Sequence, residues 1–380
     1  MKDVIIVGAG PAGSSAALRL ASAGYDVTLL ERSRFPRTKV CGDYLSAGGV
    51  SLLHELDVAG PALEGAYPIK AIALHGFGEH LRMTLPQQAL ALPRSTLDER
   101  LRQAALRAGA HVFHGSFLHA QVRRRDMSVH LRDAHGREVT IAARVLLGAD
   151  GAWSSVAQRC ALAPRIRPSG RWAVGGHLRE QRASDELEMY VGRDGYYARN
   201  PLSATSANSM LVLPRPVKPE YADPIVARIS DGARHFEPEK IERTVAIGPL
   251  AYRASSIICG RVLLTGDAAE LLDPFIGQGV TTALALSQPV ATAIAALLAG
   301  KREAQVAREY RVAWRGVVAP RRALGAFVRT IVCVDFIRQR ALRRLRGDTS
   351  LLHQLLASVS GLAPAESTLA PSALWRLLVA

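Results

Sequence analysis

Three glycines near the N-terminus have the spacing of a turn that binds phosphate groups. They follow an apolar run at 4–7 and open a segment of small residues, an order that predicts a buried strand, a tight turn and the start of a helix. The unpaired N–H groups and the positive dipole end of such a helix favour a pyrophosphate. The residues expected to form this turn and its contacts are Gly8, Gly10, Pro11, Ala12 and Gly13.

A carboxylate follows at the distance where such sites bind a ribose. A second apolar strand, 26–30, ends on Glu31, roughly 20 residues after the glycines. Glu31 would accept hydrogen bonds from the ribose hydroxyls and would repel a 2′-phosphate, so the sequence predicts FAD or NAD rather than NADP. Arg32, the next residue, is a further candidate contact.

Two more glycine turns carry an aspartate directly after an apolar strand. Asp150 and Gly151 follow the run 145–149. Asp267 follows the run 262–264, and a loop with the pattern D-P-x-x-G-x-G comes a few residues later, before an uncharged helical stretch. A lone Asp-Gly pair is a common turn, but an apolar strand in front of it is typical of a turn at the edge of a buried sheet.

Several of these segments together resemble one flavoprotein family. Residues 41–46, Cys-Gly-Asp-Tyr-Leu-Ser, resemble the C-G-x-x-L-S element of geranylgeranyl reductase-like flavoproteins, a branch of the para-hydroxybenzoate hydroxylase superfamily. The segment 94–101 resembles the R-x-x-L-D-x-x-L element, and the two aspartate turns resemble the second and third fingerprints of that superfamily. The resemblance implies FAD as the cofactor. The contacts to FAD expected on this basis are Cys41, Gly42, Arg94, Leu118, Asp150, Gly151, Asp267, Pro274, Gly277, Gln278, Gly279 and Val280.

The elements that must position these residues form two intermixed domains. Strands alternate with helices in one set of segments, which predicts an α/β, Rossmann-like FAD-binding domain of the glutathione reductase type. Short alternating runs predict an antiparallel β-sheet that would bind the substrate, and the last segment is helical. The expected bounds are 1–66, 93–168 and 254–303 for the FAD-binding domain, 67–92 and 169–253 for the substrate domain, and 304–380 for the helical C-terminal region.

Aromatic residues gather in the predicted second sheet and in the loop before it. Strands are expected at 138–141 and 145–149 of the first domain and at 173–178, 187–191, 196–200 and 209–213 of the second. One face of the second sheet, with Tyr196 among its aromatics, is expected to form a substrate wall, and ordinary core packing is the alternative. The candidate substrate contacts are Tyr44, Trp172, Tyr190 and Tyr197.

Composition limits the partners of this chain. The net charge of +15 comes almost entirely from arginines scattered along 380 residues, so we expect no nucleic-acid partner. Four cysteines lie far apart without a C-x-x-C pair, which predicts neither a metal site nor disulfides and is typical of a reducing cytoplasm. The uncharged stretch 280–300 is long enough to span a bilayer, but its alanines, serines and threonines favour a buried helix.

The basic segment 336–346 has two interpretations. It could lie on a membrane surface as an amphipathic helix, giving a peripheral membrane contact. The interpretation that the sequence favours is a solvated helix packed on the FAD-binding domain by a stripe of Phe336, Ile337, Leu342 and Leu345.

The leading functional hypothesis is an FAD-dependent monooxygenase that hydroxylates an apolar aromatic or polyketide-like small molecule with molecular oxygen, through a flavin C4a-hydroperoxide. The alternative is an FAD-dependent reductase of isoprenoid or polyene double bonds, with Cys41 as a possible proton source. The reductases usually carry a Y-x-W-x-F-P element, and residues 196–201 depart from it. A flavin-dependent halogenase and a non-catalytic prenyl carrier are more distant alternatives. The sequence has no second dinucleotide motif, so NAD(P)H is expected to act as a transient reductant unless a separate reductase supplies reduced flavin.

Overall fold

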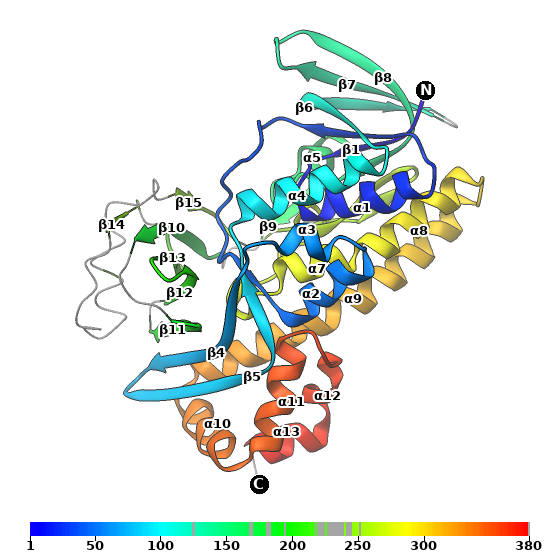
Figure 1. Cartoon of the computed structure of the whole chain (residues 1–380). Helices are drawn as coiled ribbons and strands as arrows, with labels where there is room; N and C mark the ends of the chain where they lie inside the picture. Colours follow the sequence, from blue (N-terminus) through cyan, green and yellow to red (C-terminus); the bar gives the residue numbers. More distant parts are fainter. Residues whose placement is uncertain are drawn as a thin grey trace.

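Two β-sheets divide the chain in the computed structural model (Figure 1). The residues described are 1–123, 126–166, 170–179, 184–193, 195–216, 218, 225, 239–240, 245–250 and 252–378. The expected domain boundary at 168/169 and residue 194 of the hairpin turn lie outside these ranges. The first sheet comprises β1 (Lys2–Val7), β2 (Val27–Glu31), β6 (His111–Val122), β7 (Met127–Asp133), β8 (Glu138–Gly148), β17 (Ile258–Cys259) and β18 (Val262–Leu264).

The centre of the first sheet is parallel. Strand β1 pairs with β2 on one side and with the second half of β8 on the other, and β18 follows β8. The first half of β8 instead pairs with β7 in an antiparallel hairpin. The prediction of two separate strands at 138–141 and 145–149 is therefore wrong, because one continuous strand serves both partners.

The second sheet is antiparallel except for one pair of strands. Strand β11 runs parallel to β4, since the chain leaves this sheet after β5 and returns to it through the first domain. The strands in this sheet are β3 (Tyr44–Leu45), β4 (Tyr67–Gly76), β5 (Glu79–Ala91), β10 (Trp172–Arg179), β11 (Glu186–Gly192), β12 (Gly195–Ser203), β13 (Ser206–Leu213), β14 (Glu239–Lys240) and β15 (Val245–Ile247). Strand β9 (Pro164–Ile166) pairs separately with β16 (Tyr252–Ala254).

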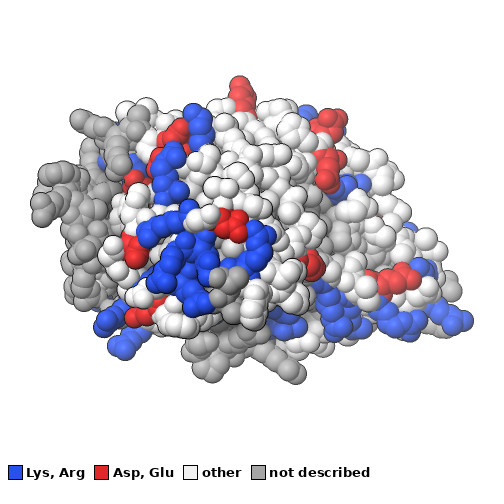
Figure 2. Space-filling model, turned by 90° about the horizontal axis from the view of Figure 1, so that it is seen from below, with Lys and Arg blue, Asp and Glu red and all other residues white. Residues whose placement is uncertain are grey.

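The C-terminal helices cover mainly the second sheet, and their contacts with the FAD-binding domain include hydrogen bonds from Gly48 and Gln278. Helix α9 (Glu303–Cys333) links the two cores, and it is followed by α10 (Asp335–Gly347), α11 (Thr349–Val359), α12 (Ala365–Leu369) and α13 (Pro371–Leu378). Leu345 packs with residues of β4, β5 and β11, whereas Phe336 is 74% exposed. The predicted stripe on the FAD-binding domain is therefore wrong. Figure 2 views the molecule from the side of these helices and shows lysine and arginine side chains gathered there.

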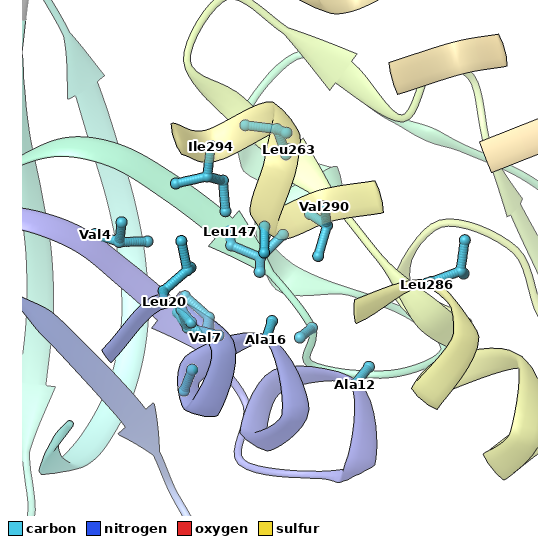
Figure 3. Packing of buried hydrophobic residues seen from close by; sticks show 14 of the residues in the cluster. Val4, Val7, Ala12, Ala16, Leu20, Leu147, Leu263, Leu286, Val290 and Ile294 are labelled. Atoms are coloured by element: carbon cyan, nitrogen blue, oxygen red, sulfur yellow. The ribbon is translucent and has the colours of Figure 1, made fainter. Parts of the chain in front are cut away.

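The first core is built between the parallel strands and two helices of small residues. Helix α1 (Pro11–Ser22) and helix α8 (Ser287–Leu298) face each other across the ends of β1, β8 and β18 (Figure 3). Ala16 and Leu20 meet Val290 and Ile294 there, and alanines allow the close approach. The span Gly279–Leu298 is apolar enough to cross a membrane, but 67% of its most apolar part is buried. This packing favours a core helix, as the composition predicts.

Candidate cofactor and active site

The first glycine turn has a shape that side chains would block. Gly8 has φ +101°, and a Cβ on it would lie 2.5 Å from the carbonyl oxygen of Ala149. A Cβ on Gly13 would lie 1.9 Å from the carbonyl oxygen of Gly8. Gly10 precedes Pro11 at the start of α1 and offers no side-chain cap, so the first-turn N–H groups stay available to an anion. The turn has the form that a pyrophosphate requires.

Glu31 lies at the end of β2, beside this turn. Its carboxylate is buried and accepts hydrogen bonds from the N–H groups of Ala9 (3.0 Å) and Ser33 (2.8 Å). Those bonds hold the carboxylate at the strand end, where the dinucleotide motif places a ribose acceptor. Arg32 is exposed, and the FAD contact expected for it remains a prediction.

The Asp150–Gly151 turn serves mainly to shape the site. The Asp150 carboxylate accepts hydrogen bonds from Ser154 Oγ (2.6 Å) and from the N–H of Ser155 (2.7 Å), at the start of α5 (Ser155–Arg159). Gly151 has φ +80°, and a Cβ there would lie 2.9 Å from Lys39 Nζ. Asp150 is thus engaged in its own turn, and Gly151 leaves room for the lysine.

Leu118 lies at an irregularity of β6, where the pairing with β7 shifts by one residue. Its carbonyl oxygen accepts a hydrogen bond from Arg159, which ties β6 to α5. The FAD contact implied for Leu118 remains a prediction.

Buried basic side chains converge between these turns and α4 (Arg94–Arg107). Arg94 makes two hydrogen bonds to Asp98, with Nε–Oδ1 at 2.7 Å and Nη2–Oδ2 at 2.9 Å. Arg37 lies 3.3 Å from the same carboxylate. Burial lowers the pKa of Lys39 and raises that of Asp267, and the charges of Lys39 and Arg94 partly oppose the rise at Asp267. Arg37 also lies 3.8 Å from the Glu31 carboxylate. Three basic groups thus gather beside the first turn, where their N–H donors could bind a diphosphate.

Arg37 and Lys39 are site residues that the sequence motifs do not predict. They lie in an arginine-rich loop that has the composition of a solvated surface. Their spacing from Cys41 was the available signal, because a loop that carries Cys41 into the site must also carry its near neighbours.

The third glycine loop packs against the Cys41 loop and the C-terminal helices. Gly277 has φ +65°, and a Cβ there would lie 2.9 Å from the ring of Tyr44. The Gln278 amide nitrogen donates to the carbonyl oxygens of Ser358 (3.3 Å) and Val359 (2.6 Å). The nitrogen of that predicted FAD contact is therefore used by the chain itself.

The rest of the third loop leads into the first core. Pro274 begins a short 3-10 turn, Gly279 starts α7 (Gly279–Ala285), and Val280 is buried. Gly279 has open space around it, with no atom within 4 Å of an added Cβ. The loop thus presents backbone rather than side chains to the site.

The segment 41–43 is fastened to the second sheet by side chains. Asn208 Nδ2 donates to the Cys41 carbonyl (2.9 Å) and to Asp43 Oδ2 (2.7 Å), while Asn200 Nδ2 donates to the Gly42 carbonyl (2.9 Å). His177 Nε2 lies 2.7 Å from Asp43 Oδ2. Burial raises the pKa of the Cys41 thiol, against the charge of Arg94. The second domain therefore positions the loop for which the sequence predicts contacts to FAD.

Sequence analysis also missed the roles of Asp43, Asn200 and His177. The available signal was the alternation in these strands, where polar residues stand at positions that should face the core. A small cleft, open to solvent, lies where this cluster meets the basic one. Its lining includes Lys39, Cys41, Arg94, His177, Asn208 and Met210.

The four proposed substrate contacts do not share one wall. Tyr44 lies beside Gly277. Tyr190 stacks on His75 at 4.5 Å and, with Tyr197, packs in a small separate cluster with Val174. Strand alternation places Trp172 on that same face. Tyr196, on the opposite face, meets Phe275 edge-on at 5.0 Å. The predicted wall is thus wrong for Tyr196, which points away from Trp172, Tyr190 and Tyr197 because neighbouring residues of a strand face opposite sides.

The comparison with known families agrees with this geometry. The family model described as "FAD binding domain" matches residues 1–319. The chain belongs to this family. It is an FAD-dependent oxidoreductase of the para-hydroxybenzoate hydroxylase superfamily and resembles its geranylgeranyl reductase-like branch. The predicted α/β fold with an FAD-binding domain, a second sheet and a helical C-terminal region is confirmed.

The names of the relatives describe more than one activity. Menaquinone reductase of Mycobacterium tuberculosis is 30% identical over 73% of this chain and 72% of its own. Digeranylgeranylglycerophospholipid reductase 1 of Methanothermobacter thermautotrophicus is 24% identical, with 74% of each chain covered. Kynurenine 3-monooxygenase of Salinispora arenicola is 27% identical over 74% and 69%. A geranylgeranyl bacteriochlorophyll reductase-like structure from Thermoplasma acidophilum shares the fold, with TM-score 0.81, 19% identity and coverage of 99% and 96%.

The residues present fit FAD. The turn at Gly8 and Gly13 excludes side chains, the cluster of Arg37, Lys39 and Arg94 matches a diphosphate, and Glu31 stands at the ribose position. No group of three or more metal-ligating side chains occurs among the described residues.

Proposed function

We propose that this protein is an FAD-dependent reductase of carbon–carbon double bonds in an apolar isoprenoid or polyene molecule. The observation that carries the proposal is the apolar sheet face next to the third glycine loop, where Tyr196, Met210 and Val212 share one buried cluster with Phe275. The polar groups Asp43, His177 and Asn208 lie at one end of that face. Met210 carries this face to the cleft that Cys41 and His177 line, and an apolar molecule would enter there. The names of two of the relatives, both reductases, support the choice of reaction.

The residues of the chain have separate tasks in this reaction. When bound and reduced, FAD would supply a hydride to one carbon of the double bond. The other carbon needs a proton, and Cys41 lies in the cleft where such a donor is required. Because burial raises the pKa of its thiol, Cys41 keeps its proton at neutral pH and can donate it. NAD(P)H is the proposed reductant and would visit the site transiently.

Mass spectrometry of the product tests the proposal. The purified protein, reduced without oxygen, would be given a menaquinone with an isoprenoid chain. We expect a product with two additional hydrogen atoms that survive reoxidation of the quinone ring in air. Cys41→Ser should slow this step by about 100-fold or more, while Cys259→Ser, at an exposed cysteine, should not. A product unchanged in mass after ring reoxidation would contradict the proposal.

A monooxygenase acting on an apolar aromatic molecule is the second candidate. The pair of His177 and Asp43 favours it, because an imidazole held by a carboxylate can accept the proton of a phenol. A monooxygenase among the relatives supports it as well. Turnover under heavy-isotope oxygen separates the two candidates, since the monooxygenase would place the label in its product and the reductase would work without oxygen.

A further inference from the structure

We propose that the outer face of helices α10 and α13 docks the protein on an anionic membrane surface. Helix α10 carries five arginines and one aspartate. Arg343 and Arg346 are exposed on α10, as Arg376 is on α13, and the two helices pack together. Figure 2 shows basic side chains gathered on this side of the molecule. Such a face is complementary in charge to phospholipid headgroups.

Ion pairs within the chain neutralise part of the positive charge on α10 and α13. Arg338, on the buried side of α10, pairs with Asp335 and lies over the ring of Phe77. Arg346 pairs with Glu79, and Arg376 with Asp348. Within the described part of the chain, no carboxylate pairs with Arg343.

Exposed aromatic side chains distinguish a lipid surface from other anionic partners. Phe336 on α10 is 74% exposed and Trp375 on α13 is 60% exposed. Val334, directly before α10, is exposed as well. Arginines that attract headgroups, beside aromatic rings that can enter the boundary of the acyl chains, are the combination found in helices that lie on membranes. A nucleic-acid phosphate backbone would use the arginines but would give Val334 and Phe336 no apolar environment.

The docking face borders an apolar crevice between α10 and the β4–β5 hairpin. Its lining includes Leu74, Phe77, Leu81, Val191, Val332 and Leu342. Val191 and Val332 belong to the same buried cluster as Tyr196 and Phe275. If the proposed function holds, an apolar substrate dissolved in the bilayer would meet the protein on the side where this crevice opens.

Sedimentation with lipid vesicles tests the docking face without any turnover. The full-length holoprotein would be mixed with vesicles of phosphatidylcholine alone or of an equimolar mixture with phosphatidylserine. We expect binding to the mixed vesicles, weaker binding at high salt, and little binding to phosphatidylcholine. Equal binding to both kinds of vesicle, or to neither, would overturn the proposal and would leave the proposed reaction untouched.

Matched variants locate the binding surface. Arg343→Glu should weaken binding to the mixed vesicles by about fivefold to thirtyfold, whereas Arg107→Glu, an equal change at an exposed residue of α4, should leave it nearly unchanged. Phe336→Ser should weaken binding, and Val122→Ser, at an exposed residue of β6, should not. Equal losses in each pair, or binding of duplex DNA in place of vesicles, would overturn the proposal. Unchanged circular dichroism and flavin content would show that each variant is folded.

Discussion

The pyrophosphate side of the site and its substrate side hold their shape in different ways. Around Gly8 and Gly13 the backbone itself is the constraint, because an added methyl group would collide with a carbonyl oxygen. Between residues 41–43 and the second sheet the constraint is a set of side-chain hydrogen bonds from Asn200, Asn208 and His177. The first arrangement packs backbone against backbone within the FAD-binding domain, Gly13 against Gly8 and Gly8 against Ala149, and the second joins residues from separate domains.

This difference has a functional meaning. A dinucleotide is the same molecule in every member of such a family, so a rigid backbone cradle can serve many reactions. The polar end of the substrate face instead depends on which side chains two strands offer to one loop. Changes in the first region should therefore affect cofactor binding and folding, while changes in the second should alter the reaction more than the binding of FAD.

Replacing Asp98 is expected to have the largest effect on stability. Its fully buried carboxylate faces Arg94 and Arg37, so Asp98→Asn would leave the mostly buried Arg94 without its countercharge and Arg37 with only Glu31, 3.8 Å away. We expect a loss of about 3–5 kcal/mol in the free energy of unfolding of the apoprotein. Urea denaturation with and without FAD measures it, and FAD should restore part of the stability because its diphosphate replaces the lost charge.

The neighbouring carboxylate is the control for Asp98. Glu99 also makes two hydrogen bonds to an arginine, with both distances to Arg102 at 2.7 Å, but its side chain is 26% exposed. Glu99→Gln should cost less than about 1 kcal/mol. Equal losses in the two variants would show that burial does not set the strength of the cluster around Asp98.

Substitutions at two glycines of the first turn distinguish effects on folding from effects on cofactor binding. In Gly13→Ala the new Cβ would lie 1.9 Å from the carbonyl oxygen of Gly8, and we expect a loss of about 1–3 kcal/mol together with loss of FAD. In Gly10→Ala the nearest atom, Arg37 Nη2, is 3.5 Å away, so the apoprotein should keep its stability. The same Cβ would occupy the approach of the pyrophosphate, so flavin content should still fall. Full flavin content in Gly10→Ala would mean that the pyrophosphate lies elsewhere.

A substitution at Asn208 tests the substrate side of the site. Asn208→Ala removes the donors to the Cys41 carbonyl and to the Asp43 carboxylate, and should cost about 2 kcal/mol. The flavin should stay bound, while turnover falls because the 41–43 segment loses its hold on the sheet. Ser209→Ala, a change at the next residue on the opposite face, should affect neither stability nor turnover. If Asn208→Ala releases FAD as readily as Gly10→Ala, the contrast between the two regions is wrong.

The same contrast explains what the sequence could predict. Excluding a Cβ is a requirement on a single residue, so the glycine turns, the strand before each of them and the FAD-binding fold could be read from short motifs. The 41–43 contacts join residues separated by 134 to 167 positions, and no local pattern encodes such a pairing. The misplaced aromatic wall was avoidable, because Tyr196 and Tyr197 are adjacent in one strand and must face opposite ways. The error in placing the C-terminal helices was unavoidable, because an amphipathic stripe does not specify which hydrophobic core it packs against.

Two buried thiols give the smallest and most local test. Burial raises the pKa of Cys160 to about 11, with the nearby Asp150 adding to the rise, while at Cys41 the charge of Arg94 opposes the effect of burial. A raised thiol pKa favours the folded state below about pH 8.5, where both states keep the proton, and this stabilisation is lost as the pH rises toward the pKa of the folded state.

Iodoacetamide labelling followed by peptide mass mapping should show Cys160 reacting near pH 11 when folded and near pH 8.5 in urea. Added FAD should slow labelling at Cys41 and leave Cys160 unchanged, because only Cys41 lines the cleft between the two regions. Equal protection of both thiols by FAD would instead mean that the cofactor tightens the whole domain rather than covering the 41–43 segment.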